Sequence, residues 1–383
     1  MENKFEHQQV FEVDVAGTKA WLVIDQLKNG LSFGGFRFDP TVSLQQVRNL
    51  AQTMSWKLAS HGLPVGGAKA GIACDPSRAD IQELLTQLAR SWEQQLTTNV
   101  VLGKDMGATN SLLDGLYSGI GQSQLNIVQG SYPHCPNKIR DLAGYKRDMT
   151  GLGAVIAAET AVNSLKGKDI LIQGAGVVAQ GIAIRAAAKG ARIVGISDVD
   201  NCLYSSDGVE VVQLIELSRT INAVIHLDEM ISGKAEASDR DSLFEKPADI
   251  LFLAAGSHTV DEHAAARIKA PVVIETSNFG LTDDANEILY RRGISVIPDI
   301  ISSSSSAAMS SHQIASGNSV PASHLWATIE NCIRNAVKTS VQNSQKNHCS
   351  IRSAYMDSFV SRSTADHNND FEIEVLEENI HGY

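Results

Sequence analysis

Lys69 lies in the stretch LPVGGAKAGIACDP, residues 63–76, where its neighbours are glycines and alanines. Glycine permits close approach of a backbone or a ligand, so little water remains around such a lysine when a ligand site closes. Desolvation, or a second cation, lowers the pKa of a lysine and suits it to acid–base work near neutral pH. Lys57, twelve residues earlier, is a candidate for that cation. A glycine-rich loop with an exposed lysine fits the spacing equally well, since most lysines are surface charges.

A carboxylate, Asp105, follows the apolar run NVVL in the stretch GKDMGAT, residues 103–109. The run is expected to form a buried strand, so Asp105 lies where that strand emerges. Carboxylates at such positions serve as general acids or bases, and more often as turn or helix-capping residues. By themselves, the residues around Asp105 favour a turn or helix-capping role over an acid–base role.

The stretch GAGVVA, residues 174–179, fits the pattern G-x-G-x-x-A of dinucleotide-binding proteins. It follows an expected strand and opens an expected helix. The first glycine permits the tight turn, the second lets a pyrophosphate approach the backbone, and the helix N-terminus attracts phosphates. An ordinary glycine-rich βα turn is the alternative. We assign to cofactor binding Gly174, Gly176, Val177 and Val178.

Asp198 extends this pattern, because it stands 24 residues after Gly174, at the end of the next expected strand. A carboxylate at that place can bond a ribose hydroxyl of the cofactor. It would favour NAD over NADP because it repels a 2′-phosphate. Asp200 lies close by, and either aspartate could instead be a turn residue.

The elements that must position these residues follow from hydrophobic periodicity. Short strands are expected within residues 10–40, followed by a helix over residues 41–62, in which Ser43 and Gln46 form a capping-box pattern. A second amphipathic helix is expected over residues 81–96.

From residue 168 onward, strand-like runs alternate with helical stretches, which predicts parallel βαβ units and a doubly wound sheet in an α/β fold. A serine-rich run, residues 302–311, is the only low-complexity stretch. Helical segments over residues 323–341 and 350–362 and an acidic tail follow it.

The composition of the chain excludes several classes of function and location. The net charge of −11 and the pI of about 5.5 argue against a nucleic-acid partner, since an acidic surface repels phosphate backbones. The polar N-terminus does not resemble a secretory signal, and no apolar run approaches the ~20 residues that span a bilayer. The five cysteines are scattered without a CxxC pair, so neither a zinc site nor a disulfide framework is indicated. A reduced, cytoplasmic location is the expectation.

The chain resembles the glutamate/leucine/phenylalanine/valine dehydrogenase family. The match covers roughly residues 30–362, and its motifs occur in the family's order: GGFRFDPTVSLQQV, MSWKLASHGLPVGGAKAGI, KDMGA, MTGLGAVIAAE, ILIQGAGVVAQG, ADILFLAA, VVIETSN, GISVIPDI and IRSAYMDSFVSR. The resemblance implies an N-terminal α/β substrate and oligomerisation domain, a Rossmann-type NAD(P)-binding domain, and a cleft between them.

The expected domain limits follow from this resemblance. Residues 1–140 form the substrate domain, to which C-terminal helices at about 335–365 return. Residues 141–334 form the cofactor domain, and residues 366–383 form the acidic tail.

The resemblance also implies roles for individual residues. Lys57 matches the lysine that binds the substrate α-carboxylate. Lys69 matches the catalytic lysine, which activates water for attack on the iminium carbon. Asp105 matches the group that exchanges protons with the substrate nitrogen. Two further positions, Thr150 and Asn278, match residues near the nicotinamide.

Three departures from the family bear on the substrate. Phe33 replaces the lysine that, in the glutamate enzymes, precedes Gly34-Gly35 and pairs with the substrate's side-chain carboxylate. We place Phe33 and both glycines in the substrate pocket. Val177 replaces an asparagine, and serines at 303–306 replace Asn-Ala-Gly-Gly beside the pocket; a surface linker is the alternative for that run. Ser310 still matches a substrate-pocket serine.

The sequence therefore predicts an NAD-dependent amino-acid dehydrogenase, with NADP as the alternative cofactor, acting on an uncharged apolar or aromatic amino acid. Its partners are then an amino acid or 2-oxo acid and ammonium, without nucleic acid, membrane or a bound metal. A homo-oligomer is expected. The alternatives are a glutamate dehydrogenase and a non-catalytic homologue that retains the fold.

Overall fold

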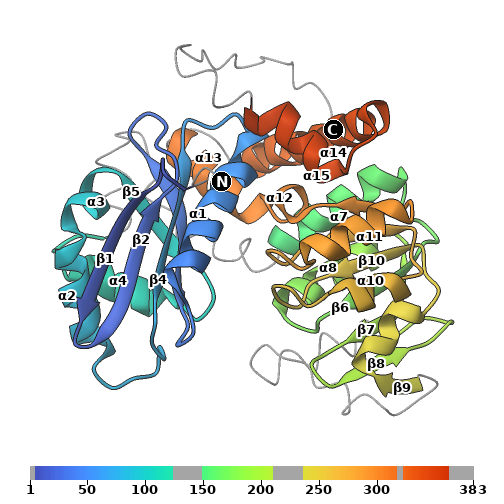
Figure 1. The fold of residues 1–383 in the computed structure, drawn as a ribbon, viewed down its shortest axis with the longest axis horizontal. Coiled ribbons are helices and arrows are strands. Elements are labelled where there is room, and N and C mark those ends of the chain that lie inside the picture. Colours follow the sequence, from blue (N-terminus) through green and yellow to red (C-terminus); the bar gives the residue numbers. More distant parts are fainter. Residues whose placement is uncertain (1–4, 124–148, 210–235, 317–321, 362–383) are drawn as a thin grey trace.

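The computed structural model describes residues 5–123, 149–209, 236–316 and 322–361. Within them the chain builds two β-sheets, which lie side by side in Figure 1 with helices packed against each. The first sheet has five strands in the order β1-β2-β4-β3-β5, and the second has seven in the order β12-β11-β10-β6-β7-β8-β9. The expected α/β fold with two units is confirmed.

The first sheet mixes antiparallel and parallel pairing. β1 and β2 and then β2 and β4 are antiparallel, whereas β3 runs parallel to both β4 and β5. The strands expected early in the chain and before Asp105 are confirmed. Their bounds are β1 (Gln9–Val15), β2 (Thr18–Ile24), β3 (Ser32–Phe38), β4 (Gly66–Ile72) and β5 (Val100–Lys104).

β4 is the central strand of this sheet, and all of its residues are buried. Its glycines make room for the helix α1 (Leu44–Ala59). A Cβ atom at Gly67 would overlap the backbone N of Ser55, and one at Gly71 would lie 2.7 Å from Cγ2 of Val47. The interpretation of this stretch as a loop with an exposed lysine is therefore wrong. The space beside these two glycines is filled by α1 and is not left for a ligand.

α1 begins where the sequence predicts. Ser43 accepts a hydrogen bond from the backbone N of Gln46, and the Gln46 side chain accepts one from the backbone N of Ser43. An N-cap of this kind stabilises a helix by about 1 kcal/mol. The cap fixes the start of the helix whose last turn carries Lys57.

Three further helices, α2 (Ile81–Ser91), α3 (Glu93–Thr98) and α4 (Asn110–Ser118), belong to the first unit. The sequence predicts one helix over residues 81–96, but the helix is interrupted at Trp92. The Trp92 ring is fully buried and lies edge-on to Phe36 of β3, with ring centroids 6.0 Å apart. Figure 1 shows α2 and α3 on the side of the sheet away from α1.

The second sheet confirms the predicted doubly wound topology. Its strands are parallel from β12 to β7, and β8 and β9 add an antiparallel edge that the sequence did not predict. The chain order reverses between β6 and β10, which is where open α/β sheets bind ligands. The strands are β6 (Asp169–Gln173), β7 (Arg192–Ser197), β8 (Asn201–Tyr204), β9 (Glu236–Asp239), β10 (Ile250–Leu253), β11 (Val272–Glu275) and β12 (Ser295–Ile297). The helix α7 (Met149–Val162) precedes these strands, and the helices between them are α8 (Val177–Ala188), the 3₁₀ helix η3 (Arg240–Glu245), α10 (Glu262–Arg267) and α11 (Asp283–Arg291).

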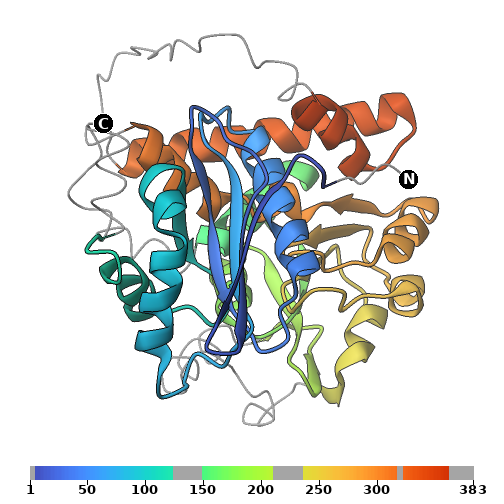
Figure 2. The same cartoon turned by 60° about the vertical axis from the view of Figure 1, so that its left-hand side comes forward.

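The C-terminal helices contact the first unit. The last of them, drawn in red, lie along the top of Figures 1 and 2, and the Tyr355 hydroxyl donates a hydrogen bond to the carbonyl O of Trp56 in α1 at 2.6 Å. Their bounds are α12 (Asp299–Ser302), α13 (Ser305–Ser316), α14 (Ala322–Asn347), α15 (Ile351–Tyr355) and the π-helix η5 (Met356–Val360).

The domain limits stay a prediction. The boundary at residues 140/141 and the tail at 366–383 lie outside the described residues. α14 runs without a break through the boundary placed at residues 334/335.

Candidate active site and cofactor-binding turn

Lys69 points to the α1 side of the first sheet. Side chains alternate along a strand, so Lys69 shares a side with Gly67 and Gly71, whose Cβ positions face α1. Its side chain is 4% exposed, and its Nζ lies 3.0 Å from Oδ2 of Asp105. Burial lowers the pKa of Lys69; Asp105 opposes that effect and Arg37 adds to it. The desolvated lysine expected from the sequence is thus present, inside a strand.

Asp105 lies just beyond β5 and meets two cations on one oxygen, Lys69 Nζ at 3.0 Å and Arg37 Nε at 2.7 Å. Burial raises the pKa of Asp105, but the two cations outweigh burial and bring the pKa down to about 2. Asp105 is therefore ionised across the neutral range. A turn or capping role alone does not account for a side chain held in this way.

Arg37 is the functional candidate that the sequence did not single out. It lies on β3 two residues after Gly35, on the same side of the strand. A Cβ atom at Gly35 would lie 2.8 Å from Cβ of Asp105 and 3.2 Å from Nζ of Lys69, so the meeting of these charges requires a glycine. Strand alternation in SFGGFRF places Arg37 on the same side as Phe33, which the sequence assigned to the substrate pocket. Arg37 could have been identified as a candidate from this alternation.

Gly34 has a separate reason to be glycine. A Cβ atom there would overlap the carbonyl O of Ala68 on β4. The close approach of the two parallel strands accounts for this residue, and its assignment to the substrate pocket stays a prediction.

Lys57 and Asn278, which the sequence assigned to the substrate and the nicotinamide respectively, are in direct contact. Lys57 Nζ donates a hydrogen bond to Oδ1 of Asn278 at 2.5 Å, across the junction of the two units. Burial lowers the pKa of Lys57 to about 8; Asp299 opposes this shift and Lys69 adds to it. Lys57 is thus close enough to feel the charge of Lys69, but the cation that lowers the pKa of Lys69 is Arg37, which the sequence did not single out.

Phe33 is buried on the side of β3 that carries Arg37. The end of its ring lies 3.1 Å from the Cβ position of Gly103, and it shares an apolar cluster with Ile314 of α13. Ser310, one turn before Ile314, is also buried and donates to the carbonyl O of Ser306 at 3.4 Å. Phe33 thus presents apolar surface at the position where the glutamate enzymes of the family carry a lysine.

The serine run is buried, so its interpretation as a surface linker is wrong. His61 Nε2 at the end of α1 lies 3.0 Å from Oγ of Ser304, which ties the run to the first unit. The hydroxyl groups are used inside the protein, each donating to a main-chain carbonyl: Ser302 to Glu275, Ser303 to Asp299 (2.7 Å), Ser304 to Ile301 (2.9 Å) and Ser305 to Met149 (2.7 Å).

The turn after β6 has the geometry that the glycine pattern predicts. Gly174 has a φ of +100°, and a Cβ atom there would lie 2.7 Å from the carbonyl O of Ala254, after β10. At Gly176, the N-cap of α8, a Cβ atom would meet nothing within 4 Å. A pyrophosphate can therefore approach the start of α8 at the point where the sheet order reverses.

Val177 and Val178 open α8, and 38% of Val177 is exposed at the helix start. Thr150 is the second residue of α7, the helix that packs on α8. Backbone N–H groups in the first turn of a helix lack intrahelical partners and bind anions. These positions suit the cofactor roles assigned from the sequence, which stay predictions.

Asp198 follows β7 and holds a tight turn. Its Oδ1 accepts hydrogen bonds from the backbone N of Asp200 at 2.9 Å and of Asn201 at 2.7 Å. The turn role left open by the sequence is therefore real. A bond from Asp198 to a ribose hydroxyl remains a prediction.

Family models match both units of the fold. Residues 7–118 match the dimerisation domain of Glu/Leu/Phe/Val dehydrogenases, and residues 144–368 match the model of Glutamate/Leucine/Phenylalanine/Valine dehydrogenase. The chain belongs to the glutamate/leucine/phenylalanine/valine dehydrogenase family. This confirms the resemblance stated from the sequence.

Among the relatives in this family, one is named as specific for NADP and another as specific for NAD. The NADP-specific glutamate dehydrogenase of Saccharolobus shibatae is 32% identical over 281 residues, which cover 70% of this chain and 64% of that protein. The NAD-specific glutamate dehydrogenase of Staphylococcus aureus is 33% identical over 296 residues, 73% of this chain and 68% of that protein. The match therefore spans about two thirds of each relative, and it supports the expectation of an NAD(P)-dependent amino-acid dehydrogenase.

Solved structures of the family share the fold. The hetero-hexameric glutamate dehydrogenase of Thermus thermophilus, in its Leu-bound form, superposes with a TM-score of 0.75 at 23% identity and covers 93% of this chain and 87% of its own. The Plasmodium falciparum glutamate dehydrogenase gives a TM-score of 0.77 at 19% identity, over 94% and 83% of the two chains. At these identities the likeness concerns the fold.

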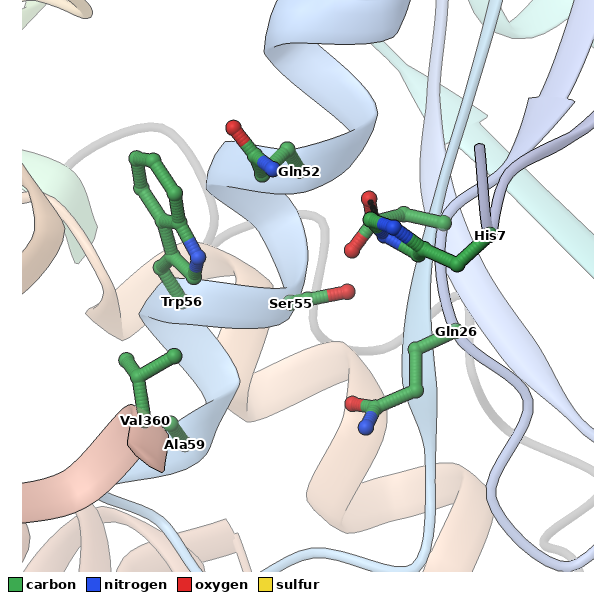
Figure 3. A pocket seen from close by; sticks show the side chains of 8 residues that line it. His7, Gln26, Gln52, Ser55, Trp56, Ala59 and Val360 are labelled. Carbon is green, nitrogen blue, oxygen red and sulfur yellow. Dashed lines mark hydrogen bonds and ion pairs between the residues drawn. The ribbon is translucent and has the colours of Figure 1, made fainter. Parts of the chain in front are cut away.

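A pocket on another side of α1 is separate from this site (Figure 3). Successive residues of an α-helix are about 100° apart, so Lys57 faces away from Ser55 and Ala59, which lie two residues from it. The pocket is lined by His7, Asp25, Gln26, Gln52, Ser55, Trp56, Ala59 and Val360. It contains none of the residues singled out above. Among the described residues, no group of three or more His, Cys, Asp or Glu could hold a metal ion, and no helix is long and apolar enough to cross a membrane.

Proposed function

We propose that this chain catalyses the NAD(P)-dependent oxidative deamination of an L-amino acid, or the reverse reductive amination. The reaction converts the amino acid, NAD(P)⁺ and water into a 2-oxo acid, ammonium, NAD(P)H and a proton. The observation that carries the proposal is the cluster of Lys69, Asp105 and Arg37, in which both cations lie within 3.0 Å of one carboxylate oxygen. Lys69 has a lowered pKa and lies beside the ionised Asp105. Two such groups can share the work of a reaction, one acting as the acid and the other as the base.

Each residue then has one task. The buried ammonium of Lys57 binds the substrate α-carboxylate. Lys69, as a neutral amine, takes a proton from the water that adds to the iminium carbon, and Asp105 exchanges protons with the substrate nitrogen. Arg37 balances the charge of Asp105, so Lys69 can lose its proton while the carboxylate stays ionised.

The cofactor accepts the hydride when it is bound. The open backbone at Gly176 and the start of α8 fit its pyrophosphate. Thr150 and Asn278 are proposed to contact the nicotinamide end. Asp198 favours NAD, with NADP as the alternative, and both cofactors occur in the names of relatives.

The substrate side chain is proposed to be uncharged, either aliphatic or aromatic. Of the described cations near the site, Arg37 and Lys69 are engaged with Asp105, and Lys57 is assigned to the α-carboxylate. Phe33 offers apolar surface instead of the family's lysine. Burying a large apolar side chain contributes about 1.5–3 kcal/mol, whereas burying an unpaired carboxylate costs more than that.

Glutamate is the second candidate substrate, because the two relatives compared with this chain are named glutamate dehydrogenases. A charged substrate would need a cation that the described residues do not offer beside Phe33. A non-catalytic homologue is a third candidate, but the intact group of Lys57, Lys69 and Asp105 argues against it.

The experiment that tests the proposal is Lys69→Ala. General acid–base groups contribute about 10²–10⁴-fold, so kcat should fall by that order while NAD(P)H still binds. Lys104→Ala, an exposed lysine beside Asp105, is the matched control and should keep its turnover. Near-normal kcat in Lys69→Ala would remove this lysine from the mechanism.

We further propose that the chain forms a homo-oligomer and is cytoplasmic. The first proposal is supported by the match to a dimerisation domain and by a hexameric structural neighbour, and the second by the cysteine usage of the sequence. Light scattering of the purified protein tests the first; a single-chain mass would contradict it.

A further inference from the structure

Two buried carboxylates and an arginine meet at the junction of the units. Arg352 of α15 places Nη2 2.8 Å from Oε2 of Glu275, the last residue of β11, and 2.5 Å from Oδ1 of Asp299, the first residue of α12. The two acidic side chains are at most 1% exposed. Without the arginine, two like charges would share a site without water, which is strongly unfavourable.

The remaining oxygens of these carboxylates hold the backbone of the loop after β11. Oδ2 of Asp299 accepts from the backbone N of Phe279 at 3.2 Å, and Oε1 of Glu275 accepts from the backbone N of Leu281 at 3.1 Å. Phe279 has a φ of +53°, a conformation that few non-glycine residues adopt without support. The two carboxylates supply part of that support, together with the backbone N of His258, which donates to the carbonyl O of Phe279 at 2.5 Å.

This loop presents Asn278 to the active site. Asn278 immediately precedes the left-handed Phe279, and its Oδ1 accepts the 2.5 Å hydrogen bond from Lys57. A continuous set of contacts therefore runs from the C-terminal helix α15 through two carboxylates and one loop to the lysine proposed to bind substrate.

We propose that Arg352 is a positioning residue: by neutralising Glu275 and Asp299, it fixes the loop at residues 276–281 and so holds Asn278 against Lys57 for substrate binding. The inference rests on the proposed function for its kinetic consequence, whereas its structural part does not. The pKa of Glu275 agrees with this proposal. Burial, and then the charge of Asp299, raise that pKa to about 7, and Arg352 opposes both effects.

The test compares Arg352→Gln with a matched control, Arg334→Gln. Arg334 also bridges two carboxylates, Glu159 and Glu330, both at 2.7 Å, but touches no residue of the loop. Arg352→Gln should raise the KM for the 2-oxo acid about tenfold or more with a smaller change in kcat, whereas Arg334→Gln should leave the KM near wild type.

A rescue separates positioning from a general loss of structure. Glu275→Gln keeps an acceptor oxygen for Leu281 while it removes one buried charge. In the Arg352→Gln background it should therefore recover part of the lost KM. A double variant with a KM as high as that of Arg352→Gln would overturn the charge-neutralisation argument.

Hydrogen exchange gives a readout that does not need activity. Backbone amides of residues 276–281 should exchange faster in Arg352→Gln than in wild type or Arg334→Gln, at a temperature where all three are folded. Unchanged exchange there overturns the proposal, whatever the kinetics. A wild-type protein inactive on every 2-oxo acid overturns the proposed function instead, and the exchange comparison still decides the structural role of Arg352.

Discussion

At the scale of single residues, the site is governed by how three charges share one buried space. Asp105 is held ionised by Lys69 and Arg37, and Lys69 is held towards its neutral form by burial. An ion pair of Arg37 and Asp105 with a neutral lysine leaves no net charge in the buried cluster. That state is the one that can take a proton from water.

Removing Arg37 should therefore shift the pH dependence of the reaction. In Arg37→Gln the pKa of Lys69 rises, because a cation that opposes its protonation is gone. Oxidative deamination needs the neutral lysine, so the limb of the kcat/KM profile that rises with pH should move to higher pH. The measurement is the pH–rate profile of wild type and variant. Arg78→Gln, which breaks an exposed pair with Asp80, is the control, and equal shifts in both variants would contradict the account.

Phe33 is proposed to set the choice of substrate. Phe33→Lys restores a cation where the glutamate enzymes have one, so the ratio of kcat/KM for 2-oxoglutarate to that for an apolar 2-oxo acid should rise by about tenfold or more. Phe33→Leu, which keeps an apolar side chain, should leave the preference as it is. A lysine variant with unaltered preference would mean that Phe33 does not contact the substrate side chain.

The sequence predicted Lys57, Lys69 and Asp105 as candidates but did not predict Arg37 or the contact of Lys57 with Asn278. Glycine spacing and apolar runs drew attention to these three residues, but only the resemblance to the family gave them functional roles. Arg37 meets Asp105 only because β3 pairs with β5, and Lys57 meets Asn278 across 221 residues of chain. Strand alternation indicates the side of β3 on which Arg37 lies, but neither of the two long-range contacts is encoded by a local pattern.

At the scale of elements, the glycines of β4 show how a strand can hold a buried lysine, which we propose to be catalytic, and pack closely against a helix. The sequence predicted α1 with its cap, because a capping box is a local signal. It did not predict β4, since glycine and alanine have low strand propensity. The sequence left open whether the serine run is buried beside the pocket or is a surface linker, because a bond such as that of Ser305 to the distant carbonyl of Met149 has no local signal.

Two glycine substitutions should separate packing from ligand approach. Gly67→Ala forces a methyl group against the backbone of Ser55 and should lower the free energy of unfolding by about 1–3 kcal/mol. Gly176→Ala meets open space and should keep its melting temperature, but it should weaken NAD(P)H binding because the methyl group stands where the pyrophosphate approaches. Thermal melts and cofactor titrations check both. The reverse pattern would show that Gly67 serves the cofactor and Gly176 the packing.

At the scale of the whole molecule, the proposed reaction needs both units, because the cluster of Lys69, Asp105 and Arg37 lies on the first sheet and the turn proposed to bind the cofactor lies on the second. α1 joins them through Lys57 and Asn278, and through His61 and Ser304. The C-terminal helices add the bond from Tyr355 to α1 and the ion cluster around Arg352. The alternation of strands and helices along the sequence allowed the doubly wound unit to be predicted. The junction could not be predicted, since it depends on side chains from three distant segments.

The most direct test of the account is the initial rate of NADH and NADPH oxidation by the purified wild-type protein with ammonium and a panel of 2-oxo acids. The panel contains 2-oxoglutarate and the 2-oxo acids of leucine, valine, phenylalanine and tyrosine. The account predicts ammonium-dependent oxidation, fastest in kcat/KM with an uncharged 2-oxo acid, and faster with NADH than with NADPH. A preference for 2-oxoglutarate over every uncharged acid would contradict the proposed specificity, and the absence of turnover with all of them would contradict the proposed enzyme.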